Sequence, residues 1–440
     1  MSAMFSQFNR RARLDTVLGL DTLLLVKLDG TEELSGDFEW RIEAISTDPA
    51  LDLNKLLGTH ATVTADIFSG EKRYFDGIVA EAKFLGNLDS GNVYSLVLRP
   101  WLHVAGFRRN QRIFHDMTVV DIVTEVFDAY AALGSPPFEF EVTDDYPVLE
   151  YTVQYGETDA DFCRRLLERF GISWHWDHTD GNHRMVLTDR IESLPGIGTR
   201  PYHGVAGTHL GDSEHFRLWE SGSRMTTGAV RLTEYNFKMP SATQEVDQTG
   251  EVTYAHGDIE SFDWPGDYLK QPTGRDVVER RVQEEQGQGP RIAAAGNVLM
   301  MGAGSLVVLT GDYLPGQTDN RFVCLKVKHS LRSQAYGTEK KISEDEDYSG
   351  TYVMMPDTTP FRPERRTPMP IIHGPQTATV VGEGEIDCDE YGRILVHFPW
   401  DLDEAISMRC RVSQNWASKG WGGMVIPRIG MEVVVEFLEG

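Results

Sequence analysis

Residues 420–440 read GWGGMVIPRIGMEVVVEFLEG and join a glycine-rich turn to a strictly alternating segment. In a strand, successive side chains point to opposite faces, so alternate apolar residues gather on one face. Here the apolar face would hold Met431, Val433, Val435 and Phe437, and the other face would hold Glu432 and Glu436. This pattern predicts a half-buried β-strand in a small barrel or sandwich.

The same stretch supplies the residues expected to hold this barrel together. They are the large apolar side chains that follow the glycine-rich turn, namely Trp421, Ile426, Ile429, Val433, Val435 and Phe437. Val434, Glu432 and Glu436 are expected to face a neighbouring chain or solvent. For Val434, packing under a loop of the same chain is the alternative. An aspartate at position 435 would put an unpaired charge in the core, and we expect it to unfold the barrel.

Composition indicates a folded protein of several domains. The chain has 440 residues, of which 40% are apolar, and its 42 glycines and 20 prolines suit strands and turns. A net charge of −25 disfavours a nucleic-acid partner, because such binding relies on Lys and Arg, and it favours solubility or a basic partner.

The four cysteines form no CxxC pair, so we expect neither a zinc ribbon nor a disulfide scaffold, and a reducing cytoplasm is the simplest location. Neither a Sec cleavage site nor an apolar run of about eighteen residues is found, so no membrane span is expected.

Residues 1–110 are expected to form a first β-barrel. Their apolar runs are short, mostly alternating and separated by Gly, Asp and Ser turns. Residues 111–200 add helices to a connecting domain. Thr118 and Thr158 are each followed three residues later by an aspartate, which is typical of helix N-caps, and Gly171 is expected to end the second helix.

Strands dominate again in residues 201–355, which predicts a second β-barrel with one helix near 275–285. Six prolines fall within residues 356–375 and predict an extended linker. Residues 376–440 contain five short apolar runs and are expected to form an OB-type barrel. The predicted fold is therefore mainly β with some α: two β-barrel domains with a helical insert, then a C-terminal OB-type five-stranded barrel.

Two blocks of this sequence resemble the VgrG spike proteins of type VI secretion systems. The first is YGETDADFCRRLLERFGI at residues 155–172. The second is a C-terminal series with DEYGR at 389–393, VHFPWD at 396–401, RVSQ at 411–414, WA at 416–417, GWGG at 420–423 and IPRIG at 426–430. The order and spacing of this series are similar to those of the family's barrel domain, and the resemblance runs over nearly the whole chain. Hub and spike proteins of contractile phages and phage-like particles share the same architecture.

The resemblance implies a homotrimer with a mechanical function. In that family, two hub barrels per chain give six around the axis and match a hexameric Hcp tube, while the OB barrel leads into a β-helix needle capped by a PAAR protein. The spike would be assembled in the bacterial cytoplasm with baseplate proteins and exported by the contractile machine without a signal peptide. It would carry toxin effectors and touch a membrane only during puncture. The resemblance implies no catalytic residue, cofactor or metal in this portion.

Full members of that family continue with an Asp-Pro-rich turn and a needle that often contains Val-Gly repeats. None of this follows Leu438. We therefore expect either a chain cut from a longer protein or a naturally short form, and the resemblance assigns neither tip binding nor a C-terminal effector enzyme to these residues.

Local motifs of common enzyme classes are not found in the sequence. It contains no GxxxxGK[ST], HExxH or GxSxG, so nucleotide hydrolysis, zinc proteolysis and esterase chemistry lack their groups. His175, His178 and His183 lie near two aspartates, and a metal site would need them to converge. The favoured interpretation places His175 in a strand and the other two histidines beside a solvated turn at 180–182. Residues 387–392 begin like a calcium loop, but the bidentate glutamate of such a loop is missing, so a β-hairpin turn is favoured.

Two other functions are alternatives to the spike hub. A cell-wall-degrading hub with a phage-type tail lysozyme would need two carboxylates about 5–10 Å apart, and the sequence singles out no such pair among its 67 acidic residues. An acidic OB-fold binding module is the other. Residues 376–440 carry 11 acidic and 5 basic residues, which is the wrong sign for a groove that binds nucleic acid. We therefore predict a spike hub that is not an enzyme.

Overall fold

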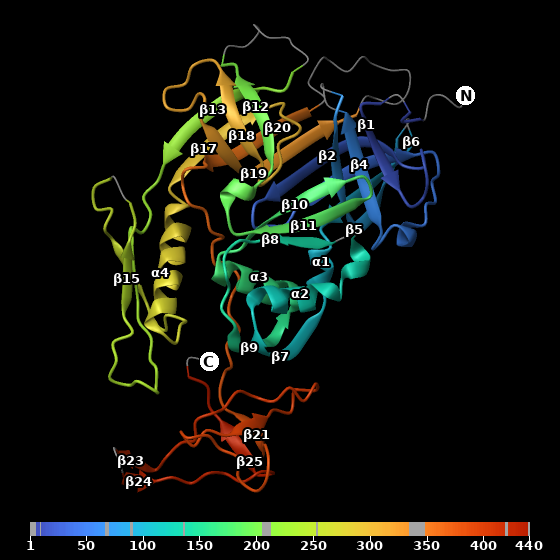
Figure 1. Cartoon of the computed structure of the whole chain (residues 1–440). Helices are drawn as coiled ribbons and strands as arrows, with labels where there is room; N and C mark the ends of the chain where they lie inside the picture. The colour runs from blue at the N-terminus through green and yellow to red at the C-terminus, as the bar shows by residue number, and fades with distance from the viewer. Residues whose placement is uncertain are drawn as a thin grey trace. The chain divides into compact units, whose positions relative to one another are not determined.

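The structure, a computed structural model, describes residues 6–8, 10–66, 70–88, 91–134, 137–204, 213–251, 254–333, 348–418 and 421–438. Over these residues the chain is mainly β with a few helices, as the sequence predicts (Figure 1). It divides into two compact units. The barrel unit comprises residues 1–103, 130–144 and 171–364, and the OB unit comprises residues 104–129, 145–170 and 365–440.

Twelve strands of the barrel unit form one continuous sheet. Their order is β1 (Ala12–Thr16), β4 (His60–Asp66), β5 (Lys72–Leu88), β6 (Gly91–Arg99), β3 (Glu39–Ser46), β2 (Leu24–Glu33), β19 (Arg321–Arg332), β18 (Leu306–Gly311), β12 (Gly196–Tyr202), β13 (Phe216–Ser223), β17 (Pro290–Gly296) and β20 (Tyr348–Pro356). Because β20 also pairs with β19, the last six strands close into a barrel. The antiparallel β2–β19 ladder connects this barrel to the first six strands, so both predicted β regions share one sheet.

The side chain of Gln7 bridges β1 and β2, the two end strands of the first six. Gln7 is buried, and its Oε1 accepts hydrogen bonds from the backbone N–H groups of Leu14 at 2.8 Å and Leu25 at 3.1 Å. Its Nε2 donates to the carbonyls of Leu14 at 3.1 Å and Leu23 at 3.3 Å. An amide side chain supplies both donors and an acceptor, so Gln7 makes the bonds between β1 and β2 that strand pairing would otherwise make.

Aromatic side chains fill the interior of the barrel unit. Inside the first six strands, Phe38 stacks on Trp40 with ring centroids 5.1 Å apart, and Phe75 meets Trp40 edge-on at 5.1 Å. Inside the closed barrel, Phe216 meets Trp219 edge-on at 5.2 Å. Each fully buried aromatic side chain stabilises the fold by roughly 2–3 kcal/mol relative to an exposed one.

Two smaller sheets complete the barrel unit. One has the order β10 (Ser173–Thr179), β11 (Asn182–Thr188) and β8 (Phe138–Glu141), and β10 and β11 pack on β5. The other has the order β15 (Val246–Thr249), β14 (Ala229–Leu232) and β16 (Glu260–Asp263). The helix α4 (Gln271–Gln286), predicted at 275–285, runs alongside β15 (Figure 1). The remaining short elements are η2 (Leu53–Lys55), α1 (Leu102–Ala105), η3 (Ala131–Leu133) and η4 (Ile191–Ser193).

The OB unit combines a helical part with a small barrel. Its helical part holds β7 (Arg109–Met117), α2 (Val119–Asp128), β9 (Leu149–Thr158) and α3 (Asp159–Phe170). In its OB domain, β22 (Leu395–His397), β21 (Gln376–Val381) and β25 (Glu432–Val435) form a three-stranded sheet in that order, and β23 (Trp416–Ser418) and β24 (Trp421–Gly423) form a separate hairpin. Both predicted helix caps are confirmed. Asp121 donates its N–H to the Thr118 hydroxyl at 3.2 Å, and Asp161 donates to the Thr158 hydroxyl at 3.0 Å. Within the described ranges, no helix combines the length and apolarity that a membrane span requires.

The predicted linker is extended, without helix or strand over residues 357–375. Within the barrel unit, Arg362 fastens it to three other segments. Its Nη1 donates to the carbonyls of Gly171 at 3.1 Å and Asp189 at 2.9 Å, and its Nε donates to Gln283 Oε1 on α4 at 2.8 Å. The planar guanidinium fork is suited to several bonds in fixed directions.

Replacing Arg362 with alanine should therefore lower the free energy of unfolding of the barrel unit by about 2–3 kcal/mol, because partly buried carbonyls lose a charged donor. Arg362→Lys keeps the charge but not the fork, and we expect it to recover less than half of this loss. Urea unfolding of the two variants and the unchanged protein measures the difference. Equal stability of all three proteins would show that the linker is not fastened in this way.

Candidate functional site

The predicted strand at the C-terminal end packs its inner face on the barrel core. The buried core cluster consists of Ala378, Val380, Ile394, Val396 and Phe398, and the predicted residues packed against it are Ile426, Ile429, Val433, Val435 and Phe437. β25 pairs with β21 with Val433 opposite Ala378 and Val435 opposite Gln376. Since a shift of one residue would exchange the two faces, this register places the alternate valines inward.

Trp421 differs from the prediction that it packs in the barrel core. It lies in the β23–β24 hairpin with 54% of its surface exposed, and it meets the exposed Trp416 edge-on at 4.9 Å. The glycine-rich hairpin holds this side chain outside the core. After the hairpin, Ile426 is the first residue that packs against the core cluster. Trp421 is therefore an exposed aromatic residue and not a core residue.

Val434 lies on the outer face of β25. It is 67% exposed, so a loop of the same chain does not cover it, and the two glutamates on the strand are exposed as well. Met431 was predicted on the inner face, but it precedes β25 and is 52% exposed. Val425 and Leu438 of the same domain are also exposed. Exposed apolar residues gathered on one small domain are typical of surfaces that bind another protein chain.

The acidic segment 387–392 lies in the connection between the antiparallel strands β21 and β22, as a hairpin connection longer than a tight turn. Arginines occupy its carboxylates. Asp387 pairs with Arg409 at 2.7 Å, and Asp389 pairs with Arg393 at 2.7 Å. These ion pairs give the two aspartates a structural role that needs no calcium ion.

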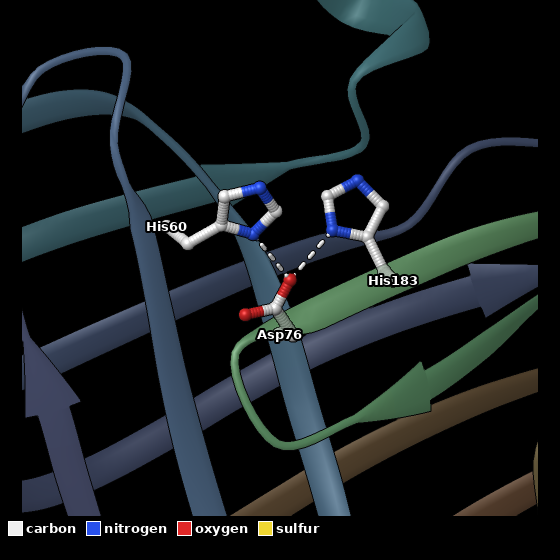
Figure 2. Close-up of side chains that lie close together, drawn as sticks. All are labelled: His60, Asp76 and His183. Carbon is white, nitrogen blue, oxygen red and sulfur yellow. Dashed lines mark hydrogen bonds and ion pairs between the residues drawn. The ribbon is translucent and has the colours of Figure 1, made fainter. Parts of the chain in front are cut away.

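In the barrel unit, side chains from three strands converge on one carboxylate. Asp76 on β5 is fully buried and lies between His60 on β4 and His183 on β11 (Figure 2). Its Oδ1 lies 2.8 Å from His60 Nδ1 and 2.7 Å from His183 Nδ1, and its Oδ2 accepts a hydrogen bond from the Thr62 hydroxyl at 2.6 Å. The carboxylate thus joins the β10–β11 hairpin to β4 and β5 of the large sheet.

The Nε2 atoms of His60 and His183, which do not face Asp76, show which of the two imidazoles is positively charged. His183 Nε2 accepts the backbone N–H of Trp101 at 2.9 Å, so its proton is on Nδ1 and the ring is neutral, in keeping with burial, which lowers the pKa of His183. His60 Nε2 faces the carbonyl of Leu133 at 3.1 Å, so both nitrogens of His60 face acceptors. Burial lowers the pKa of His60, but the hydrogen bond and charge of Asp76 raise it by more, and the net pKa lies above 6.5. The pKa of Asp76 is raised by burial but lowered further by its two histidine partners, to well below 3.8. His60 and Asp76 thus form an ion pair.

Within the described part of the chain, these three residues are also close enough to hold a metal ion, since their ligand atoms all lie within 4.8 Å of one another. A metal on His183 Nδ1 would move the ring proton to Nε2, where it would face the N–H of Trp101. This conflict of two donors favours a hydrogen-bond network over a metal centre. That the chain holds no metal stays a prediction.

Two of the three histidines singled out in the sequence, His178 and His183, lie elsewhere than predicted. His175 is in β10 and the turn at 180–181 is exposed, as predicted, but His178 and His183 are buried opposite each other in the β10–β11 register. Phe38 packs edge-on against both rings, at 4.8 and 5.2 Å. Burial lowers the pKa of His175 to about 4 and that of His178 to about 3, so both rings are neutral. The two rings face the interior because the hairpin packs on β5.

The His60–Asp76 pair predicts a loss of stability at mildly alkaline pH. A group whose pKa is raised by folding contributes stability that is complete below its unfolded pKa, about 6.5 for histidine, and that is lost as the pH rises through the folded pKa. The melting temperature should therefore fall as the pH rises from about 6.5 through the raised pKa of His60. In His60→Gln this part of the pH dependence should disappear. Parallel pH profiles of the two proteins would contradict the assignment.

Comparison with known proteins bears out the fold. Residues 31–335 match the family model described as phage tail baseplate hub (GPD), and residues 376–440 match the one described as type VI secretion system/phage-baseplate injector OB domain. The E. coli c3393 protein is a type VI secretion system component with structural similarity to the T4 bacteriophage tail proteins gp27 and gp5. It shares the fold with a TM-score of 0.68 and 19% identity over 97% of each chain. The fold and its matches define a protein of the phage-tail-hub class.

Two curated relatives show which family within this class the chain belongs to. Over 99% of its length, the chain is 35% identical to the type VI secretion system spike protein VgrG1b of Pseudomonas aeruginosa and 34% identical to VgrG1a of the same organism. The chain belongs to the VgrG family of type VI secretion spike proteins, which confirms the resemblance found in the sequence. It spans 59% of the length of VgrG1b and 68% of that of VgrG1a.

Proposed function

We propose that this chain is the hub and spike base of a type VI contractile injection machine and acts as a homotrimer. The observation that carries this proposal is the match of nearly the whole chain to VgrG spike proteins. The exposed face of β25 supports it, because the apolar side chain of Val434 there can be covered by a second and third copy. Trp421 and Val434 are the assembly residues of this proposal. Ile426, Ile429, Val433, Val435 and Phe437 stabilise the barrel that presents them.

The proposed partners follow from the family. The two barrels of three chains would sit on a hexameric Hcp tube, baseplate proteins would surround the hub, and toxin effectors and a PAAR tip would be carried on a needle that extends the OB barrel. The proposed domains are residues 1–110 and 201–355 for the two hub barrels, 111–200 for the connecting domain, 356–375 for the linker and 376–440 for the OB barrel. The spike would form in the bacterial cytoplasm and leave with the contracting machine, touching a membrane only as it punctures it.

We propose a mechanical role without bond-making. Among the described residues, His60, Asp76 and His183 are close enough together to hold a metal ion, and hydrogen bonds to the sheet and to one another occupy them. The alternatives of a tail lysozyme hub and of an acidic OB-fold binding module have no comparable observation in their favour.

Deleting the gene tests the function. We expect the tube protein and its effectors to disappear from the culture medium of the source bacterium, and the gene to restore them. A variant with Val434→Asp should accumulate in the cell without restoring export, because it would not trimerise. Undiminished export in the deletion strain, measured with any second copy of such a spike gene also removed, would contradict the proposal.

A further inference from the structure

The small sheet β15–β14–β16 in the barrel unit has one covered and one open face. Val230 and Leu232 of β14 pack with Val278 and Val282 of α4 in a buried cluster, which covers the first face. On the open face, Arg231 of β14 retains 42% of its side-chain surface exposed. β16 is the outer strand in the order of this sheet. Among the described residues, no strand pairs with the outer edge of β16, so the sheet offers an open face and an open edge together.

Backbone hydrogen bonds show which groups of β16 point outward. The carbonyl of Ile259 accepts the N–H groups of Gly228 at 3.1 Å and Ala229 at 3.3 Å, and that of Asp263 accepts the N–H of Thr233 at 3.4 Å. Successive backbone groups of a strand alternate in direction, so the amide and carbonyl of the intervening even-numbered residues point away from β14. The outward groups of the edge are those of Glu260 and Phe262.

Side chains on the open face are acidic and aromatic. Arg231 pairs with Glu260 at 2.8 Å and with Glu245 at 3.8 Å, and its guanidinium lies 5.2 Å above the ring of Phe262. Asp247 lies opposite Arg231 in the β14–β15 register and is exposed. One guanidinium thus faces three carboxylates, and Phe262 remains 53% exposed beside them. The face has an excess of negative charge around an apolar ring.

We propose that β16 receives an extended basic segment of a partner protein by strand addition. Edge strands are usually protected by short length, charged side chains, proline or a bulge, and residues 260–263 read ESFD, so the protection of this four-residue edge is acidic. Acidic side chains repel an acidic or identical strand but not a basic one. A lysine or arginine of the added strand would lie beside Glu260, and an apolar residue two positions further along, on the same face, would lie on Phe262. Pairing with a second copy of this edge is disfavoured because glutamate would face glutamate. This inference does not depend on the proposed function.

A synthetic peptide of repeating Lys-Thr-Val-Thr, in which lysine and valine alternate along one face of the added strand, is the probe for the full-length protein and is labelled for fluorescence anisotropy. We expect it to bind, and the same peptide with all backbone amides methylated to bind at least about tenfold more weakly, because that peptide keeps its charges but cannot donate to the edge. Glu260→Lys should weaken binding by a similar factor. Glu220→Lys is the matched control, since Glu220 is exposed on β13, an inner strand of the large sheet, and it should change little.

The pair Phe262→Ala and Phe262→Pro isolates the backbone contribution. Both variants lose the ring, and proline also removes the outward N–H, a change that edge strands tolerate. We expect Phe262→Pro to bind the peptide several-fold more weakly than Phe262→Ala. Equal affinity of the two variants, or equal binding of the two peptides, would overturn strand addition. Concentration-dependent self-association that Phe262→Pro abolishes would overturn the choice of a basic partner and would assign the edge to a second copy.

Discussion

Asp76→Ala is expected to lower the free energy of unfolding of the barrel unit by about 3–5 kcal/mol, the range for removing one partner of a buried ion pair. The carboxylate accepts hydrogen bonds from His60, His183 and Thr62, and its loss leaves a partly buried imidazolium without its counter-charge. Hydrogen exchange in β4, β5 and β11 under increasing urea would measure the change, because these strands carry Asp76 and its three partners.

Two further variants separate the charge from the hydrogen bonds. In Asp76→Asn, the amide oxygen can still accept from both histidines and the amide N–H₂ can donate to the Thr62 hydroxyl, so we expect a smaller loss than with alanine. Asp66→Ala removes an exposed carboxylate at the end of β4 and should be near neutral. If Asp76→Ala were no more destabilising than Asp66→Ala, the network would have no structural role.

Val435→Asp and Val434→Asp should give opposite outcomes although the two positions are adjacent. Val435 packs on the OB core, so an aspartate there is expected to cost about 3 kcal/mol or more and to unfold the barrel. Val434 is exposed, so an aspartate there should leave the barrel folded and should prevent association through this face. The matched pair therefore separates the stability of the barrel from its assembly.

Circular dichroism and hydrogen exchange of β21 and β25 report the fold of the barrel, and light scattering reports its association. The expected result is an unfolded barrel only for Val435→Asp and dissociation without unfolding only for Val434→Asp. If Val434→Asp also unfolded the barrel, or if both variants behaved like the unchanged protein, the register assigned to β25 would be incorrect.

Local signals in the sequence predict local structure well in this chain. The threonine caps at positions 118 and 158 lie where their aspartate partners indicate, and the alternation of β25 predicts its inner face. Long-range pairing has no such signal. Nothing near β2 indicates that it pairs with β19, or that the side chain of Gln7 bridges β1 and β2.

The buried network shows the same limit. The sequence singles out His183, but its partners His60 and Asp76 come from two other strands and are brought to it by the packing of the β10–β11 hairpin on β5. One signal was present: Asp76 follows Phe75 and precedes Gly77 and Ile78, and a carboxylate within such an apolar run needs a partner when the strand is buried. Trp421 illustrates the opposite error, since apolar size alone does not distinguish a core residue from an exposed one.

The native mass of the full-length protein in solution tests the proposed trimer most directly. We expect a species of three chains that the Val434→Asp substitution converts to single chains. A protein that stays a single chain at the highest concentration at which it is soluble, or that closes as a pair, would contradict it.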